Sequence, residues 1–248
     1  MISKNQIKLI KQLEQKKHRQ RQRLFVAEGP KVVGDLMRRS RPVAVYATED
    51  YSPTLFADMV EHITNDELRK VSFLQHPQQV IALFPLPENE LPAYSPSQLT
   101  LALDGVQDPG NLGTIIRLAD WFGIDHIVCS EDTADAWNPK VVQATMGSIA
   151  RIRLTYTNLY SFIQQLPEDT PVYGTLLDGE NIYSQQLTPN GIIIMGNEGN
   201  GLSAEVRQII THRLLIPNYC KGDTAESLNV AIATGIICAE FRRQHSLV

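Results

Sequence analysis

The chain has 248 residues, of which 43% are hydrophobic, so it is long enough for one large domain or two modest ones with packed cores. Its net charge of −4 argues against a general nucleic-acid binder. Three widely separated cysteines exclude a disulfide framework and are interpreted as buried free thiols. Because we find no apolar leader and no uncharged run of membrane-spanning length, we expect a soluble, cytoplasmic protein.

The N-terminal segment is strongly basic. Residues 1–23 contain eight Lys or Arg and one acid, a charge of +7, which leaves −11 for the rest of the chain. Such asymmetry is typical of an arm that binds a polyanion, although a lone run of charges is more often a solvated helix face. Within this segment Ile7, Ile10 and Leu13 have helical spacing, which predicts a short helix with one apolar stripe.

Residues 24–84 are predicted to form a small α/β unit and, with the basic arm, a first domain over 1–84. Pro30 stands where the first residue of a helix is tolerated. The expected strands are 24–29, 42–48 and 79–84, and the expected helices begin at Pro30 or cover 54–60 and 66–71. Four prolines within 85–98 then predict a semi-rigid linker without regular structure.

Beyond the linker, residues 99–248 alternate between strand and helix patterns. Apolar strands that alternate with helices predict a mostly parallel sheet covered on both faces. The expected strands are 99–103, 127–129, 152–154, 172–175, 192–195 and 214–216, and the expected helices are 112–122, 139–146, 159–166, 204–210 and 227–242. Ligands of such sheets bind beyond the carboxyl ends of the strands, so a site is expected in the loops that follow them.

The first of these loops is DGVQDPGNLGTIIR, residues 104–117. Asn111 is a natural N-cap for a helix, and Gly113 lets another backbone approach the first turn. Arg117 lies six residues after Asn111, so one helix can present both side chains to the same side. A capped helix with a surface arginine explains the same pattern.

The second loop, MGNEGNGLS at 195–203, is rich in glycine and carries Glu198 in its middle. Its glycines are spaced three and then two apart, the reverse of the dinucleotide fingerprint, and the P-loop lysine is missing. Because a carboxylate repels a phosphate, the loop is predicted to approach a ligand or residue that tolerates Glu198. A hairpin-like structural turn is about equally compatible with the glycine spacing.

The third loop, IPNYCKGDTAESLNVAIATGI at 216–236, joins the end of a strand to a helix. Ser227 is expected to start this helix, with Asn229 in its first turn. Small residues at Ala231, Ala233 and Gly235 predict tight helix packing, which leaves the polar pair in SLN unexplained.

Together the three loops resemble, in order and spacing, the signature motifs of the SpoU (TrmH-type) branch of the SPOUT RNA methyltransferases. The matching forms are N-x-G-x-x-x-R at 111–117, G-N-E-x-x-G-L at 196–202, and I-P with a glycine-containing loop and E-S-L-N-V at 216–230. NPKVVQATMGS at 138–148 is also similar to the family's helix between the first two motifs. The resemblance is strong over 99–245, and residues 1–84 resemble the family's small substrate-binding domain. One departure is the lengthened loop at 218–221, at the rim of the implied cofactor site.

The resemblance implies a C-terminal α/β-knot domain with a deep trefoil knot and a smaller N-terminal α/β domain that binds the substrate. It implies methyl transfer from S-adenosylmethionine to a ribose 2′-hydroxyl of RNA by a homodimer, with no metal. The implied catalytic residues are Arg117, Asn111, Glu198, Ser227 and Asn229, and the implied cofactor-binding residues are Thr175, Leu176, Gly196, Asn197, Gly201, Ile216 and Leu228. In this setting the basic arm is expected to bind RNA phosphates through Lys16, Lys17, Arg19 and Arg21.

The resemblance makes Arg117 the principal catalytic residue, reaching into the partner's cofactor pocket. A guanidinium hardly deprotonates, so we assign Arg117 an electrostatic role on the ribose oxygen rather than that of a base. Ribosomal RNA is favoured over transfer RNA, because two-domain members more often act on it, and the nucleotide is left open. A non-catalytic RNA-binding or assembly factor is the alternative, and the intact Arg117, Glu198 and Asn229 count against it. A nicotinamide-dependent oxidoreductase fails on the glycine spacing.

Overall fold

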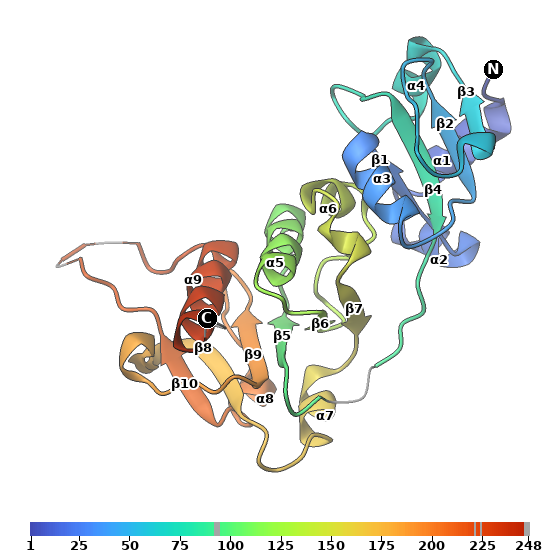
Figure 1. Ribbon diagram of the computed structural model, residues 1–248. Coiled ribbons are helices and arrows are strands. Elements are labelled where there is room, and N and C mark those ends of the chain that lie inside the picture. Colours follow the sequence, from blue (N-terminus) through green and yellow to red (C-terminus); the bar gives the residue numbers. More distant parts are fainter. Residues whose placement is uncertain (92–94, 221, 224, 246–248) are drawn as a thin grey trace. The chain divides into compact units, whose positions relative to one another are not determined.

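The computed structural model describes residues 1–91, 95–220, 222–223 and 225–245. Its backbone forms two compact units (Figure 1). The first combines residues 1–88 with 135–151, and the second combines 89–134 with the chain from residue 152 onward. Parts of the predicted linker and of the lengthened loop, including Lys221, lie outside the described residues, as do the last three residues of the predicted domain 99–248.

The first unit is built on a four-stranded sheet in the order β1-β4-β2-β3. β4 pairs antiparallel with β1 and β2, and β3 pairs parallel with β2. The elements are β1 (Leu24–Glu28), α3 (Pro30–Met37), β2 (Ala44–Ala47), η1 (Ala57–Met59), β3 (Val60–His62), α4 (Asn65–Val71) and β4 (Val80–Pro85). The predicted helix over 54–60 is wrong, because the chain makes only one 3-10 turn there and from Val60 onward pairs its backbone with β2.

Residues 135–151 contribute α6 (Pro139–Ala144) and η2 (Ser148–Ala150) to the first unit. α6 packs against β1, and η2 packs against α3. The helix between the first two motifs is therefore part of the N-terminal unit, although strands of the other unit precede and follow it in the sequence.

Two helices precede the first sheet, α1 (Lys4–Gln12) and α2 (Lys16–Gln22). α1 begins at a capping box in which the Ser3 side chain accepts from the backbone of Gln6. Ile10 and Leu13 are fully buried in the core of the unit, which confirms the predicted apolar stripe.

Arg19 on α2 is buried, with 2% of its side chain exposed. Its guanidinium donates to the carbonyl oxygens of Leu13 and Glu14, both at 2.7 Å, and pairs with Asp135 at 2.5 Å. The expectation that Arg19 binds RNA is therefore wrong, because its guanidinium is buried and paired with Asp135 inside the first unit. The other three predicted RNA-binding residues are exposed.

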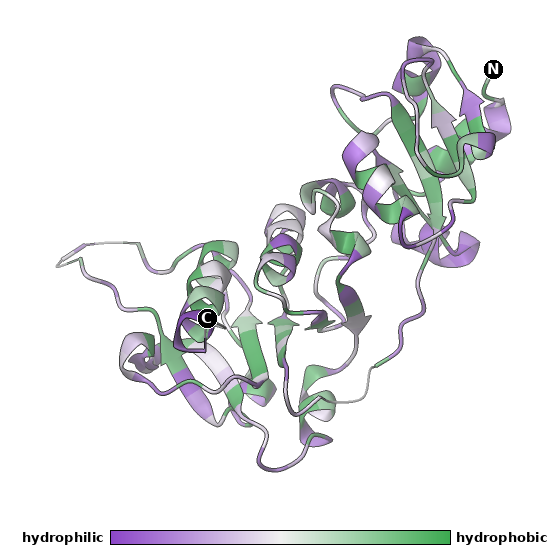
Figure 2. Cartoon of the chain, in the orientation of Figure 1, coloured by the Kyte–Doolittle hydropathy of each residue, from purple (hydrophilic) through white to green (hydrophobic). Residues whose placement is uncertain are grey.

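The second unit contains a six-stranded sheet in the order β10-β8-β9-β5-β6-β7. Every neighbouring pair of these strands is parallel, which confirms the predicted parallel sheet. The strands are β5 (Leu99–Asp104), β6 (His126–Cys129), β7 (Arg153–Tyr156), β8 (Val172–Asn181), β9 (Gly191–Gly196) and β10 (His212–Leu215). β5 and β9 are buried along most of their length and hydrophobic in Figure 2, as strands covered on both faces should be.

The helices of the second unit lie where the sequence predicts them, but two begin at different residues. They are α5 (Pro109–Trp121), α7 (Leu159–Gln164), α8 (Ala204–Arg207) and α9 (Val230–Gln244), with η3 (Ile182–Ser184) after β8. Asp108 caps α5, since Pro109 fixes the first helical residue, and its carboxylate accepts from the backbone N–H of Asn111. Asn229, and not Ser227, caps α9. The predictions of Asn111 and Ser227 as helix caps are therefore wrong. Because Asn111 does not cap α5, its side chain can make other contacts.

Two of the three cysteines are buried free thiols, as expected, whereas Cys220 is exposed. Burial raises the pKa of Cys129 and that of Cys238 to about 12, so both thiols are protonated. Within the part of the chain that the structure describes, no helix is long and apolar enough to cross a membrane, and no group of His, Cys, Asp or Glu could hold a metal ion.

Candidate functional site

A break in the pairing of β8 opens a cavity at one end of the second sheet. β10 pairs with β8 up to Arg213, opposite Gly174, and then jumps in register so that Leu214 lies opposite Glu180. Pairing of β8 with β9 also ends at Gly174. Residues 175–179 are therefore released from both neighbours, and a bulge of this kind turns side chains toward a site.

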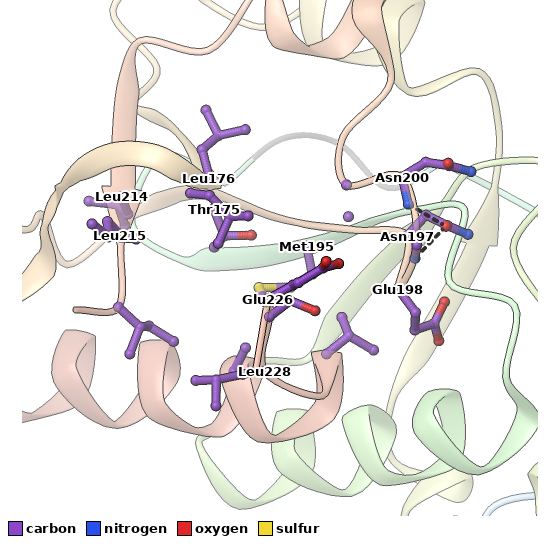
Figure 3. A pocket seen from close by; sticks show the side chains of 18 of the residues that line it. Thr175, Leu176, Met195, Asn197, Glu198, Asn200, Leu214, Leu215, Glu226 and Leu228 are labelled. Atoms are coloured by element: carbon purple, nitrogen blue, oxygen red, sulfur yellow. Dashed lines mark hydrogen bonds between the residues drawn. The ribbon is translucent and has the colours of Figure 1, made fainter. Parts of the chain in front are cut away.

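The cavity has a volume of about 540 Å³ and lies at the carboxyl ends of β9 and β10 (Figure 3). The apolar part of its wall is formed by Leu176, Met195, Leu214 and Leu228, and Figure 3 shows Glu226 among them. All seven predicted cofactor-binding residues line it, and so do Glu198 and Ser227 from the predicted catalytic group: Thr175, Leu176, Gly196, Asn197, Glu198, Gly201, Ile216, Ser227 and Leu228.

The glycine-rich loop forms a tight turn over this cavity. Asn197 and Gly201 form an antiparallel bridge, and the side-chain oxygen of Asn197 accepts from the backbone N–H of Gly199 and of Asn200 (Figure 3). The Asn197 amide nitrogen donates to the Gly105 carbonyl at 2.6 Å, which ties the turn to the end of β5. The sequence left two interpretations of this loop open, a structural turn and a loop that lines a ligand site. In the structure one element is both.

Gly196 is required because the turn closes back on it. A Cβ at this position would lie 2.5 Å from the carbonyl carbon of Gly201 and 2.7 Å from the amide nitrogen of Leu202, both backbone atoms. We expect Gly196→Ala to shift the turn and to weaken ligand binding by about 5- to 150-fold, the equivalent of about 1–3 kcal/mol of overpacking. Gly199→Ala is the matched control, since its Cβ would meet only the Asn197 side chain at 3.6 Å. Calorimetric titration of both variants checks this, and equal affinities would refute the steric argument.

The three motif loops meet in a hydrogen-bonded chain of side chains. The Asn111 amide nitrogen donates to the Glu198 carboxylate at 2.9 Å, and the Asn229 amide nitrogen donates to the Asn111 side-chain oxygen at 2.9 Å. The backbone N–H of Gln107 donates to the other Glu198 oxygen at 3.4 Å. Glu198 is therefore placed where it accepts from the first loop, which answers why a carboxylate stands in a glycine-rich turn.

Two predicted catalytic residues stand apart from this chain of hydrogen bonds. Ser227 lines the cavity but is exposed. Arg117 is exposed on α5 and does not line the cavity of its own chain. The structure thus brings Asn111, Glu198 and Asn229 together and leaves Arg117 facing solvent.

The charge of the cavity argues against a phosphate. Its lining carries three carboxylates, Asp178, Glu198 and Glu226, and one guanidinium, Arg207, a net of −2. Arg207 is itself paired with Asp178 at 3.0 Å. An anionic ligand group would be repelled here, and a cationic one is attracted.

Residues 98–239, more than half of the chain, match the model of the SpoU rRNA Methylase family. The chain belongs to this family. Residues 4–82 also match the MRM3-like substrate binding domain. The resemblance of the three motifs to the SpoU branch is thereby confirmed, and so is the prediction of the SpoU methyltransferase fold with a smaller N-terminal domain.

Similar members of the SpoU family are known as enzymes and as structures. The 23S rRNA (guanosine(2553)-2′-O)-methyltransferase RlmP of Bacillus subtilis is 34% identical over 97% of each chain. RlmB of Neisseria meningitidis, a 23S rRNA (guanosine-2′-O-)-methyltransferase, is 30% identical over 84% of each chain. A TrmH-family protein from Porphyromonas gingivalis has a TM-score of 0.88 and 41% identity, covering 98% of this chain and 99% of its own. The AdoMet-bound rRNA methyltransferase from Sinorhizobium meliloti has a TM-score of 0.86 and 32% identity, covering 100% and 98%.

Sequence reasoning did not predict several of the residues that line this cavity. Leu177 and Asp178 line it because β8 leaves its neighbours, and Arg207 lines it from α8. No motif marks these positions. Glu226 also lines the cavity, and its place in the third motif, directly before Ser227, was the available signal.

Proposed function

We propose that this protein transfers the methyl group of S-adenosylmethionine to a ribose 2′-hydroxyl of ribosomal RNA, at a guanosine of 23S rRNA. The observation that carries the proposal is the Asn111–Glu198–Asn229 chain, which joins three motif loops beside a cavity of negative charge. The relatives that align over most of this chain are named for guanosine 2′-O-methylation of 23S rRNA, and this favours ribosomal RNA over transfer RNA.

The cavity residues fit S-adenosylmethionine. Its volume of about 540 Å³ is within the usual range of small-molecule sites, about 300–1,000 Å³. Leu176, Met195 and Leu228 offer apolar surface to the adenosine, and the carboxylates of Glu226 and Glu198 suit a ligand with a sulfonium and an ammonium group. When bound, S-adenosylmethionine supplies an electrophilic methyl group.

In this proposal the protein's own side chains hold the ribose and stabilise the negative charge that develops on its 2′-oxygen. A ribose hydroxyl is a weak nucleophile until its proton begins to leave, and in this proposal that proton passes to solvent water. The 2′-oxygen takes the methyl group as the bond from sulfur to methyl breaks, and S-adenosylhomocysteine leaves. Arg117 is proposed to bind the adjacent phosphate and to stabilise the growing negative charge on the 2′-oxygen, while it keeps its own proton. Asn111, Glu198 and Asn229 hold the loops in place, and Ser227 at the cavity edge orients the ribose.

A homodimer is part of the proposal, because Arg117 does not line its own cavity. α5 and α9 pack against each other and leave Trp121 84% and Ile232 58% exposed. Arg117 lies one helical turn before Trp121, on the same side of α5. Exposed apolar patches of this kind mark interaction sites, and a second copy seated on these helices would receive Arg117 at its cavity.

The trefoil knot and the cytoplasmic location are proposed with the function. The cavity is bounded by the loops after β9 and β10 and by the start of α9, segments that a knot would hold together. The relatives are named for 23S rRNA, and this supports a cytoplasmic location.

The function is tested by mapping ribose methylation by mass spectrometry in RNA from cells with and without the protein. We expect one 2′-O-methylguanosine of 23S rRNA to disappear and to return with the wild type but not with Arg117→Ala. Calorimetry with S-adenosylmethionine accompanies the mapping. Cofactor binding without any change in methylation would favour the non-catalytic assembly factor instead.

A further inference from the structure

One charged group of S-adenosylmethionine still lacks a match in the cavity. Glu198 and Glu226 line the cavity and suit the sulfonium and ammonium groups of the cofactor, but its methionine end also carries an α-carboxylate (Figure 3). The carboxylates of the lining would repel this group unless a cation stands beside it. Among the described residues that line the cavity, the one cation is Arg207. Arg207 is therefore the side chain whose charge can match the α-carboxylate.

The backbone that carries Arg207 is fixed beside the cavity wall. Arg207 ends the short helix α8, which is capped by Ser203. The backbone N–H of Ser203 donates to the Asp104 carboxylate at the end of β5, at 2.7 Å. Val206, directly before Arg207, is 3% exposed and packs in one core cluster with Leu176, which itself lines the cavity. The guanidinium therefore moves on a side chain with a firm base.

Arg207 has a partner that it can exchange. One of its terminal nitrogens lies 3.2 Å and 3.0 Å from the two carboxylate oxygens of Asp178, in the released segment of β8. The side chain of Arg207 is 40% exposed and that of Asp178 is 56% exposed. Because water screens an ion pair as exposed as this one, the pair contributes little to stability. A second carboxylate can therefore take the place of Asp178 at little cost.

Asp178 would keep a cation after such an exchange. A guanidinium nitrogen of Arg213, on β10, lies 3.2 Å from the same carboxylate. Two guanidiniums thus share one carboxylate, and the cluster has a net charge of +1. If Arg207 turns to the cofactor, Asp178 stays paired with Arg213, and both carboxylates then have a cation. A single ion pair at this place would leave Asp178 unmatched.

We propose that Arg207 binds the α-carboxylate of S-adenosylmethionine, while Asp178 stays paired with Arg213. The inference rests on the cofactor of the proposed function and adds how its amino-acid end is recognised. A guanidinium presents planar N–H donors that match a carboxylate with two parallel hydrogen bonds. Carboxylates on the positive groups and a guanidinium on the negative group together select a ligand with a complete methionine end. An adenosine compound without the α-carboxylate would lose the contact with Arg207.

The test measures the binding of two ligands by calorimetric titration, without RNA. They are S-adenosylmethionine and decarboxylated S-adenosylmethionine, which keeps the sulfonium and a charged amine but lacks the carboxylate. We expect Arg207→Gln to bind S-adenosylmethionine about 10- to 100-fold more weakly, the usual effect of losing a hydrogen bond between charged groups. Its affinity for the decarboxylated ligand should stay within about twofold of the wild type, as for a surface substitution.

Arg213→Gln is the matched control. It removes the same charge from the same carboxylate, but Arg213 does not line the cavity. We expect it to bind both ligands within about twofold of the wild type. An equal loss of S-adenosylmethionine affinity in Arg207→Gln and Arg213→Gln would overturn the carboxylate site, because the effect would then follow the charge of the cluster and not a contact.

The decarboxylated ligand also reports whether the cavity of each variant is folded. Arg207→Gln that keeps its affinity for S-adenosylmethionine, or that loses both ligands equally, would overturn the carboxylate site. The inference and the proposed function can fail separately. Wild type that shows the selective loss in Arg207→Gln yet methylates no RNA would support the carboxylate site while the proposed function fails. Wild type that methylates RNA, with an affinity that Arg207→Gln leaves unchanged, would overturn the carboxylate site alone.

Discussion

Replacing Arg117 by alanine is expected to lower the turnover of methyl transfer by about 10²–10³-fold and to leave S-adenosylmethionine affinity within about twofold of the wild type. The reason is that the guanidinium is assigned to charge on the ribose oxygen, a charge that grows only in the transition state. Arg117 is exposed and does not line the cavity of its own chain, so its loss should not disturb cofactor binding. Single-turnover kinetics and calorimetry measure the two quantities separately.

A mixing experiment decides which subunit supplies Arg117. Arg117→Ala keeps an intact cavity, and Gly196→Val keeps an intact Arg117 while filling the turn over its own cavity. If Arg117 acts across a two-fold interface, random mixing of the two inactive variants should restore about a quarter of the wild-type activity. A mixture as inactive as its components would show that Arg117 acts within one chain and would remove the main reason for the dimer.

Replacing Arg19 by alanine is expected to lower the free energy of unfolding of the first unit by about 3–5 kcal/mol, the usual cost of removing one partner of a buried ion pair. The Asp135 carboxylate, 15% exposed, would lose its partner, and two backbone carbonyls would lose their donor. Urea unfolding followed by the fluorescence of Trp137, which packs against Phe25 in this unit, measures the change.

Arg21→Ala is the matched control for Arg19, because it removes the same charge from an exposed position of the same helix. Its free energy of unfolding should change by less than about 0.5 kcal/mol. Equal urea midpoints for the two variants would contradict a structural role for Arg19. Lys16, Lys17 and Arg21 remain the predicted RNA contacts of the basic arm.

Much of the candidate site could be read from the sequence because its residues follow strands in recognisable loops. The parallel sheet places the ends of β9 and β10 at one edge, and the seven cofactor residues implied by the family resemblance all line the cavity there, five of them within the motifs. Helix starts were less predictable. Asp108 and Asn111 are both good caps, and the choice was made by Pro109 together with the bond from Asn111 to Glu198.

The sequence by itself determined the alternation of strands and helices, the three polar loops and the family, because each of these depends on local patterns and spacing. Tertiary structure alone decided the rest. It moved residues 135–151 into the first unit, buried Arg19 against Asp135, and released residues 175–179 of β8 into the cavity wall. These outcomes depend on which distant segments supply a counter-charge, a backbone partner or a close-packed glycine. A charge or a strand pattern looks the same in sequence whether or not such a partner lies beside it.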